Sequence, residues 1–243
     1  MIPKIIHYCW FGRGKMPKLA KKCIKSWKKY CPDYEIKEWN EDNFDLDMYP
    51  YVREAYDNRK FAFVTDVVRL YALYHEGGIY MDTDVEVIKP LDPFLKHTAF
   101  SGFEDETMVP TGIMASEKGG RWAKENLEYY IGRHFLKPDG TPDTTTNVVV
   151  ITNYMLSHGL QQNNTLQDFP GFITMYPKDY FCPKSYEDLK IYKTKNTVTI
   201  HHFAGSWLPW EGKILKKFAW LRKRYPRIYH HFVYVPILKL AKS

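Results

Sequence analysis

The chain has 243 residues, enough for one large domain or two small ones, and its 44% hydrophobic and 26% charged residues are typical of a globular protein. No apolar run approaches the roughly 20 residues that cross a bilayer, and MIPKIIHYCWFG lacks the charged start and clean apolar stretch of a signal peptide. These features exclude a disordered chain. They predict a cytoplasmic protein, with at most a peripheral contact on the inner face of the cell membrane.

The net charge of +7 is distributed unevenly. Residues 1–29 carry nine Lys or Arg and no acid, and residues 211–243 carry nine against Glu211 alone, so the total of +7 leaves −10 for residues 30–210. A basic start and a basic tail around an acidic centre indicate two tasks: an anionic surface met by the ends, and a group chelated in the middle. The four cysteines show no C-x-x-C spacing and are expected to be reduced, mostly buried thiols.

Strand-like and helix-like patterns alternate along the chain and predict an α/β sandwich. The N-terminal part predicts a strand over 3–10, a helix over 16–30 with its lysines opposite an apolar face, and a strand over 34–39. The central part predicts a helix over 65–76, ended by Gly77-Gly78, and a strand over 79–87. Later segments predict strands over 97–104, 112–116 and from 197, a helix over 119–134 and a loop over 137–147; residues 148–158 and 187–193 stay ambiguous.

An acidic pair, Asp82-Thr83-Asp84, ends the predicted central strand. Residues two apart on a strand point to the same face, so both carboxylates can converge on one point. Two hard oxygen ligands there suit Mg²⁺ or Mn²⁺, with open positions for the phosphates of a substrate. A solvated strand end is the common alternative for three residues of this kind.

Asp66 and Arg69 precede the acidic pair and lie three apart on one face of the predicted helix. Such a pair is usually a surface ion pair. Here it is embedded in FAFVTDVVRLYALY, and this apolar setting favours a buried or ligand-facing role.

The whole unit, T-D-x-x-R-x-x-A-L-x-x-x-G-G-I-Y-x-D-x-D, resembles the DXD region of glycosyltransferase family 32, shared with the glucosylating domains of large clostridial toxins and related to fungal initiating mannosyltransferases. The opening IPKIIHYCWFG is similar to the family's first strand, in which Trp10 matches a Trp that stacks on uracil. HHFAGSWLPW resembles the loop that supplies a His ligand to the metal. The spacing H-x-x-G-x-x-x-P-W counts from His202 and favours it over His201.

The resemblance implies a nucleotide-sugar-binding, Rossmann-like sandwich of the GT-A type over residues 1–210. The composition of residues 211–243 predicts a basic, partly helical tail after it. The resemblance further implies a retaining transferase that moves a hexosyl unit from a nucleotide-diphosphate sugar, a UDP-sugar from the Trp10 match, to a saccharide acceptor. A lipid-linked oligosaccharide of capsule or surface polysaccharide synthesis is the acceptor expected from bacterial relatives.

The resemblance also implies a set of site residues. Catalytic roles fall on Asp66, Arg69, Asp82 and Asp84; donor contacts on His7, Trp10, Asp66, Arg69, Tyr80, Asp82, Ser206 and Trp207; and ligation of Mn²⁺ or Mg²⁺ on Asp82, Asp84 and His202.

Two other classes compete with this interpretation. A basic nucleic-acid-binding protein would explain the pI near 9.0 and the aromatic content, but the acidic centre and the lack of a recognisable binding module oppose it. A membrane-surface scaffold without catalysis is opposed by the intact acidic residues.

In the tail, Ile214, Leu215, Phe218 and Leu221 have helical spacing among basic residues, and Pro226 and Pro236 predict two short segments. Contact with an anionic membrane and packing back onto the domain remain alternatives for this tail.

Overall fold

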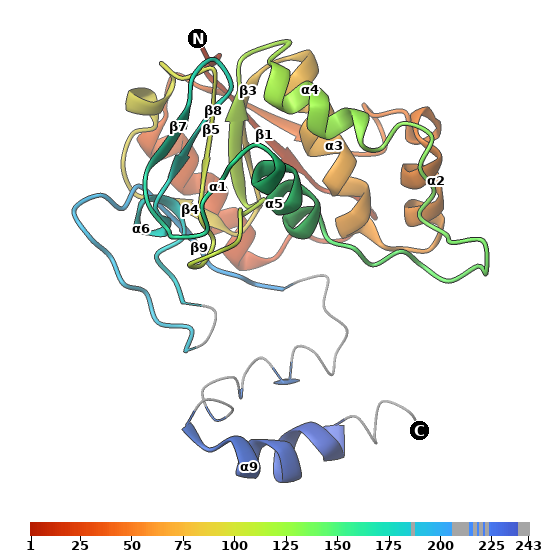
Figure 1. The fold of residues 1–243 in the computed structure, drawn as a ribbon. Helices are drawn as coiled ribbons and strands as arrows, with labels where there is room; N and C mark the ends of the chain where they lie inside the picture. The colour runs from red at the N-terminus through yellow and green to blue at the C-terminus, as the bar shows by residue number, and fades with distance from the viewer. Residues whose placement is uncertain (186–187, 206–213, 216–217, 219–220, 222–223, 238–243) are drawn as a thin grey trace.

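The computed structural model of the protein describes residues 1–185, 188–205, 214–215, 218, 221 and 224–237. Its centre is a mixed seven-stranded sheet in the order β2-β1-β3-β6-β5-β8-β7 (Figure 1). The strands are β1 (Ile5–Cys9), β2 (Glu35–Trp39), β3 (Gly78–Met81), β5 (Ala99–Gly102), β6 (Ile113–Ser116), β7 (Gln167–Phe169) and β8 (Ile173–Tyr176). A second, two-stranded sheet pairs β4 (Val85–Val87) with β9 (Thr199–His201) in antiparallel fashion.

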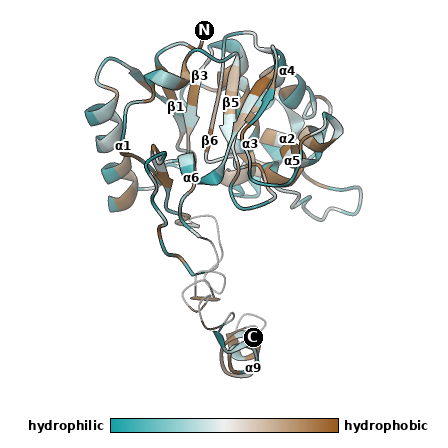
Figure 2. Cartoon of the chain, turned by 60° about the vertical axis from the view of Figure 1, so that its left-hand side comes forward, coloured by the Kyte–Doolittle hydropathy of each residue, from teal (hydrophilic) through white to brown (hydrophobic). Residues whose placement is uncertain are grey.

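Helices cover both faces of the large sheet, with α1 on one side and α2 to α5 on the other (Figure 2). The helices are α1 (Lys18–Tyr30), α2 (Pro50–Asp57), α3 (Phe61–His75), α4 (Arg121–Glu128), α5 (Asn147–Ser157), α6 (Lys178–Phe181) and α9 (Pro226–Tyr229), with 3₁₀ turns η1 (Leu46–Met48) and η2 (Asp92–Phe94). Because side chains alternate between the two faces of the sheet, the hydrophobic core consists of two clusters, one on each face. Ile79 and Met81 of β3 pack with Trp27 of α1, whereas Tyr80 packs with α3. This arrangement confirms the predicted α/β sandwich.

Gly77 and Gly78 turn the chain from α3 directly into β3. Gly77 has φ +71° and its N–H donates to the Leu73 carbonyl, the usual left-handed end of a helix. Gly78 has φ +111°, and a Cβ there would lie 2.6 Å from the Ile5 carbonyl oxygen of β1. The two glycines therefore allow β3 to lie beside β1, as the sequence predicted for a helix-to-strand junction.

The structure differs from the sequence-based prediction in four places. The strand predicted over 79–87 is divided into β3 and β4, because residues 82–84 form a turn. Helix α2 lies between the strand predicted over 34–39 and the helix predicted over 65–76, where no element was expected, and it begins at Pro50, a residue suited to the first helical position. The ambiguous 148–158 segment is α5, and β7 and β8 form a hairpin that the sequence did not reveal.

In the tail, the helical run 226–237 consists of α9, a π-turn η3 (His230–Tyr234) and a last turn that includes Pro236. The start of this run at Pro226 agrees with the prediction. Pro236, in contrast, does not end the run as predicted. Proline has no N–H to donate to a helical hydrogen bond, and the wider π-turn lies directly before this residue. Three apolar residues of this run, Tyr229, Val233 and Ile237, pack against Ile214, Leu215 and Leu221. The domain boundary expected at 210 falls within 206–213, outside the described residues. Within the described part of the chain, every helix is too short or too polar to cross a bilayer.

Candidate metal and donor site

The acidic pair lies where parallel strands β1 and β3 end at the same edge of the sheet. The turn is closed by the Val85 N–H, which donates to the Asp82 carbonyl at 2.9 Å, and the Asp82 N–H donates to the Gly112 carbonyl at 2.9 Å. The two carboxylates therefore converge through a tight turn between β3 and β4. The alternation of side chains along one strand, which the sequence suggested, is not the reason.

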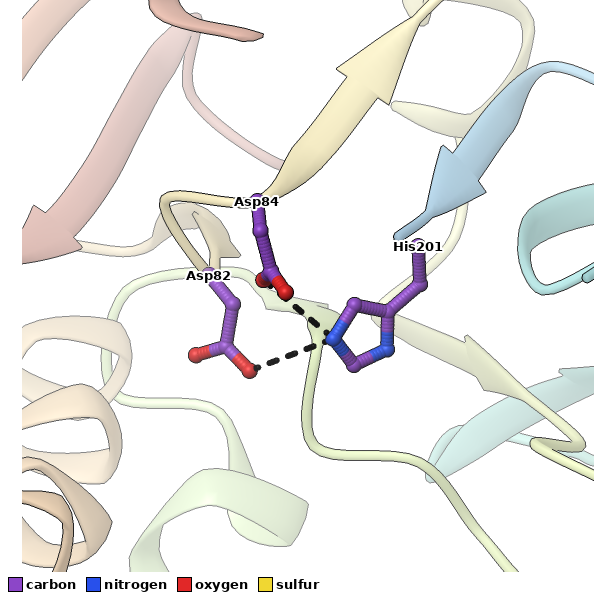
Figure 3. Close-up of side chains that lie close together, drawn as sticks. All are labelled: Asp82, Asp84 and His201. Atoms are coloured by element: carbon purple, nitrogen blue, oxygen red, sulfur yellow. Dashed lines mark ion pairs between the residues drawn. The ribbon is translucent and has the colours of Figure 1, made fainter. Parts of the chain in front are cut away.

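Three ligand-type side chains meet at this turn (Figure 3). His201 Nε2 lies 3.3 Å from Asp84 Oδ1 and 3.9 Å from Asp82 Oδ2, and one potential ligand atom from each of the three residues lies within 4.8 Å of the others. Two carboxylates and an imidazole are a donor set that fits a divalent ion such as Mn²⁺. A further acid, Glu104, is half-buried, and its partial desolvation raises its pKa.

Backbone contacts from the segment after β9 hold Asp84 in place. The Ala204 N–H donates to Asp84 Oδ2 at 2.6 Å, and the His202 N–H donates to the Asp84 carbonyl at 3.0 Å. Burial acts to raise the pKa of Asp84, but the charge of His201 and the hydrogen bonds from the His201 side chain and the Ala204 N–H hold it well below its usual range. Burial acts to lower the pKa of His201, but the negative charge of Asp84 and its hydrogen bond to the ring raise this pKa above its ordinary value.

The structure brings His201 to the carboxylates and not His202, which the motif spacing favoured. His202 Nε2 lies 2.8 Å from Glu86 Oε2, and Glu86 also pairs with Lys22 at 3.0 Å. Neighbouring residues at the end of β9 point to opposite sides, and the pairing of Val85 with His201 decides which side faces the turn. A count along the sequence could not decide this.

Arg69 links the helix to the acidic turn from a buried position. Its Nη2 lies 3.5 Å from both Asp66 Oδ1 and Asp82 Oδ1, and its Nη1 donates to the Thr111 carbonyl at 2.8 Å. The guanidinium lies over the Tyr80 ring, 4.6 Å from its centroid, and the Tyr80 hydroxyl donates to Asp82 Oδ1 at 2.8 Å. Arg69 and Tyr80 therefore orient Asp82.

Asp66 is 7% exposed, and burial raises its pKa to about 7 despite the charge of Arg69. The backbone carbonyl of Asp66 accepts a hydrogen bond from the Asn147 side chain at 3.1 Å, which connects α3 to the start of α5. The pair that the sequence predicted to be buried or ligand-facing is thus buried. It is also part of the same hydrogen-bonded and charged network as Asp82.

Gly112 is a site residue that the sequence analysis missed. A Cβ at this position would lie 2.7 Å from His201 Nδ1 and 2.8 Å from its Cε1, so the imidazole occupies the space a side chain would need. The centroid of the His201 ring also lies 4.2 Å from that of the Phe203 ring. The available signal was the isolated glycine at the start of a strand pattern, which indicates a close approach of another group.

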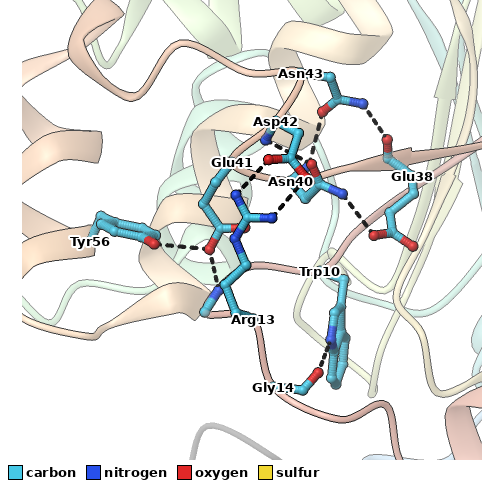
Figure 4. Close-up of polar contacts among 10 residues, drawn as sticks. Trp10, Arg13, Gly14, Glu38, Asn40, Glu41, Asp42, Asn43 and Tyr56 are labelled. Atoms are coloured by element: carbon cyan, nitrogen blue, oxygen red, sulfur yellow. Dashed lines mark hydrogen bonds and ion pairs between the residues drawn. The ribbon is translucent and has the colours of Figure 1, made fainter.

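The remaining expected donor contacts have different outcomes. His7 is fully buried, with one ring nitrogen 2.7 Å from the Gly77 carbonyl and the other accepting from Trp39, so both nitrogens serve the core and not a ligand. Trp10 is half-buried directly after β1, and its indole N–H donates to the Gly14 carbonyl at 2.7 Å (Figure 4). Trp10 therefore lies at the sheet edge that carries the acidic turn. Ser206 and Trp207 lie outside the described residues.

The paired carboxylates lie at the carboxyl ends of the strands, the edge at which open α/β sheets commonly bind their ligands. Residues 17–101 match the family model described as a glycosyltransferase sugar-binding region containing the DXD motif. This match confirms that the segment resembles the DXD region of glycosyltransferase family 32.

Curated relatives include two yeast proteins. The chain is 34% identical over 122 residues to inositol phosphoceramide mannosyltransferase 3 of Schizosaccharomyces pombe, covering 49% of this chain and 34% of that protein. It is 29% identical over 120 residues to the mannosyl phosphorylinositol ceramide synthase SUR1 of Saccharomyces cerevisiae, covering 48% and 31%. The chain thus spans about a third of the length of these relatives.

Among solved structures, a glycosyltransferase involved in glycosylation of the major capsid of PBCV-1 aligns with a TM-score of 0.48 and 16% identity, covering 83% of this chain and 94% of that one.

The two histidines allow a direct test of the ligand set. Loss of a residue that only hydrogen-bonds to a metal ligand typically weakens metal binding by about ten- to a hundredfold. His201 is a candidate ligand itself, so we expect His201→Ala to weaken Mn²⁺ binding by more than this. His202→Ala removes a side chain that contacts Glu86, and its effect on Mn²⁺ affinity should stay below about tenfold. Calorimetric titration of both variants with Mn²⁺ measures the difference, and a larger loss in His202→Ala would reverse the assignment.

Proposed function

We propose that the protein is a metal-dependent retaining glycosyltransferase that transfers a hexosyl unit from a nucleotide-diphosphate sugar to a saccharide acceptor. The observation that carries this proposal is the cluster of Asp82, Asp84 and His201 at the end of β3, inside the segment that matches the DXD family model. The charge distribution agrees with it, because the acidic central part of the chain contains the cation site.

The proposed reaction breaks the bond between the sugar C1 and the diphosphate oxygen and forms a bond from C1 to an acceptor hydroxyl oxygen on the same face. The acceptor proton passes to an oxygen of the departing diphosphate. Asp82, Asp84 and His201 would hold a divalent ion, which would supply Lewis-acid neutralisation of the charge that develops on the diphosphate. Arg69 keeps Asp82 oriented and adds a fixed positive charge, and Asp66 accepts hydrogen bonds from the sugar hydroxyls.

The donor and the acceptor are proposed on separate grounds. A UDP-sugar is proposed because Trp10, which lies at this sheet edge, matches in sequence the Trp that stacks on uracil in family 32. A lipid-linked saccharide is proposed as acceptor, and the names of the yeast relatives, which both include a phosphoinositol ceramide, support an acceptor with a lipid part. We therefore place the protein in surface polysaccharide synthesis at the inner face of the cell membrane, in contact with its anionic lipids through the basic tail over 211–243.

A panel of nucleotide sugars tests the proposal. The purified chain is incubated with UDP- and GDP-linked hexoses, with Mn²⁺ or with a chelator, and release of free nucleotide is measured. Turnover of one donor that requires the ion is the expected result. Release that persists undiminished in the chelator contradicts the metal-dependent mechanism. Turnover of GDP-linked mannose alone would replace the UDP proposal.

Trp10 tests the recognition of the base. We expect Trp10→Ala to weaken binding of free UDP by about 1–3 kcal/mol, the contribution of one aromatic stack on a base. Trp10→Phe retains a stacking ring but loses the hydrogen bond to Gly14, so it should recover most of the affinity. Calorimetry with UDP compares the three proteins, and equal affinity in Trp10→Ala and the unsubstituted chain would assign this ring to packing alone.

A further inference from the structure

A second charged feature of the molecule lies on the face of α1 that is turned away from the sheet. Helix α1 buries Ala20, Cys23 and Trp27 and contains no acidic residue. Its six lysines are all exposed to solvent: Lys18, Lys21, Lys22, Lys25, Lys28 and Lys29. Among the residues that the structure describes, Lys22 is the member of this set that forms an ion pair, with Glu86.

The lysine face borders a groove of about 500 Å³ between α1 and β4. Its walls include Lys22, Lys25, Lys28 and Lys29 on the helix and Glu86 on the strand. Glu86 is contacted by both Lys22, at 3.0 Å, and His202, at 2.8 Å, so its charge is already compensated. The groove therefore presents an excess of positive charge to any molecule that enters it.

We infer that this groove and the lysine face of α1 form a docking surface for an anionic phospholipid bilayer, separate from the basic tail. The charge complementarity is that of lysine ammonium groups with lipid phosphates. The face holds lysines and no arginine, which suits diffuse attraction to mobile headgroups more than the bidentate recognition of nucleic-acid bases and phosphates. The half-buried Tyr30 ring, with Lys29 Nζ 4.9 Å from its centroid, provides an amphipathic group at the end of this face.

The location of the groove relates it to the proposed active site. Strand β4 begins directly after Asp84, and Glu86 in the groove wall follows two residues later, a distance of about 7 Å along a strand. A bilayer at α1 would thus lie close to the acidic turn and could present a lipid-linked acceptor there. This last step depends on the proposed function, whereas docking to the bilayer does not.

The test uses the full chain with three of the lysines replaced. In the triple variant Lys25→Gln, Lys28→Gln and Lys29→Gln, sedimentation with vesicles of mixed phosphatidylglycerol and phosphatidylcholine should show binding weakened by roughly a hundredfold, about fivefold for each lysine. A matched control, Lys96→Gln, Lys118→Gln and Lys124→Gln, has the same net charge and alters exposed lysines elsewhere on the domain. Its binding should stay within about threefold of that of the unsubstituted chain.

Three results would overturn the inference. Undiminished vesicle binding in the α1 variant would leave the tail as the contact. Equal losses in both triple variants would show an effect of net charge alone. Tighter binding to duplex DNA than to the vesicles would identify the face as a nucleic-acid surface. Nucleotide release from the soluble donor is measured in parallel and should be unchanged in the α1 variant, so failure of the proposed transferase activity and failure of docking are separate outcomes.

Discussion

Asp84→Asn should lower the turnover of the nucleotide-sugar donor by about a thousandfold or more at saturating Mn²⁺. The substitution keeps the size of the side chain and leaves an oxygen for the Ala204 N–H, but it removes one negative charge from the candidate ligand set. Lewis-acid stabilisation of a leaving group contributes several kcal/mol to catalysis, and each 1.4 kcal/mol is a factor of about ten in rate. Nucleotide release under steady-state conditions measures the loss.

The control for this experiment is Glu86→Gln. Glu86 follows Asp84 by two residues but contacts Lys22 and His202 and does not contribute to the cluster with His201. Its replacement should change donor turnover by less than about threefold, and both variants should keep the circular dichroism spectrum of the unsubstituted chain. Near-normal turnover in Asp84→Asn would remove Asp84 from the metal site.

Arg69→Met should lower the free energy of unfolding by about 3–5 kcal/mol, the cost of breaking a buried ion pair by removal of one partner. Arg69 is 5% exposed and compensates the carboxylates of Asp66 and Asp82, both 3.5 Å from its Nη2. Methionine fills the space of the stem but leaves Asp66 buried without a positive partner and the Thr111 carbonyl without its donor. Urea denaturation measures the change in the free energy of unfolding.

Two further variants separate this effect from a general response to loss of an arginine. Arg121→Met breaks an exposed pair with Glu125 and should cost less than about 1 kcal/mol. Arg69→Met combined with Asp66→Asn removes a buried negative charge together with the positive one, and it should recover part of the lost stability. An Arg69→Met protein as stable as Arg121→Met would mean that the buried network contributes little to the fold.

The sequence by itself determined the local features of this site. The apolar setting of Asp66 and Arg69 predicted a buried or ligand-facing pair, and the two glycines after the helix predicted the junction that leads into the strand and its acidic residues. These predictions succeeded because they depend on neighbours within about twenty residues, through helical spacing, strand alternation and backbone conformations that favour glycine. The short strands β7 and β8 are stabilised by pairing with other strands of the sheet and not by their near neighbours in the sequence. The local sequence pattern therefore did not predict them.

Only the tertiary structure decided which groups complete the cluster. The choice of His201 depends on the antiparallel register of β9 on β4, across more than a hundred residues of chain, and a shift of one residue would present His202 to the acids instead. The close approach of Gly112 to His201 and the hydrogen bond from Arg69 to the Thr111 carbonyl likewise join segments that are far apart in the sequence. The ligand set combines the turn after β3 with the end of β9, so it forms only when β9 pairs with β4. The local sequence does not specify which side of β9 will face the turn, and the histidine that completes the set could therefore not be predicted from it.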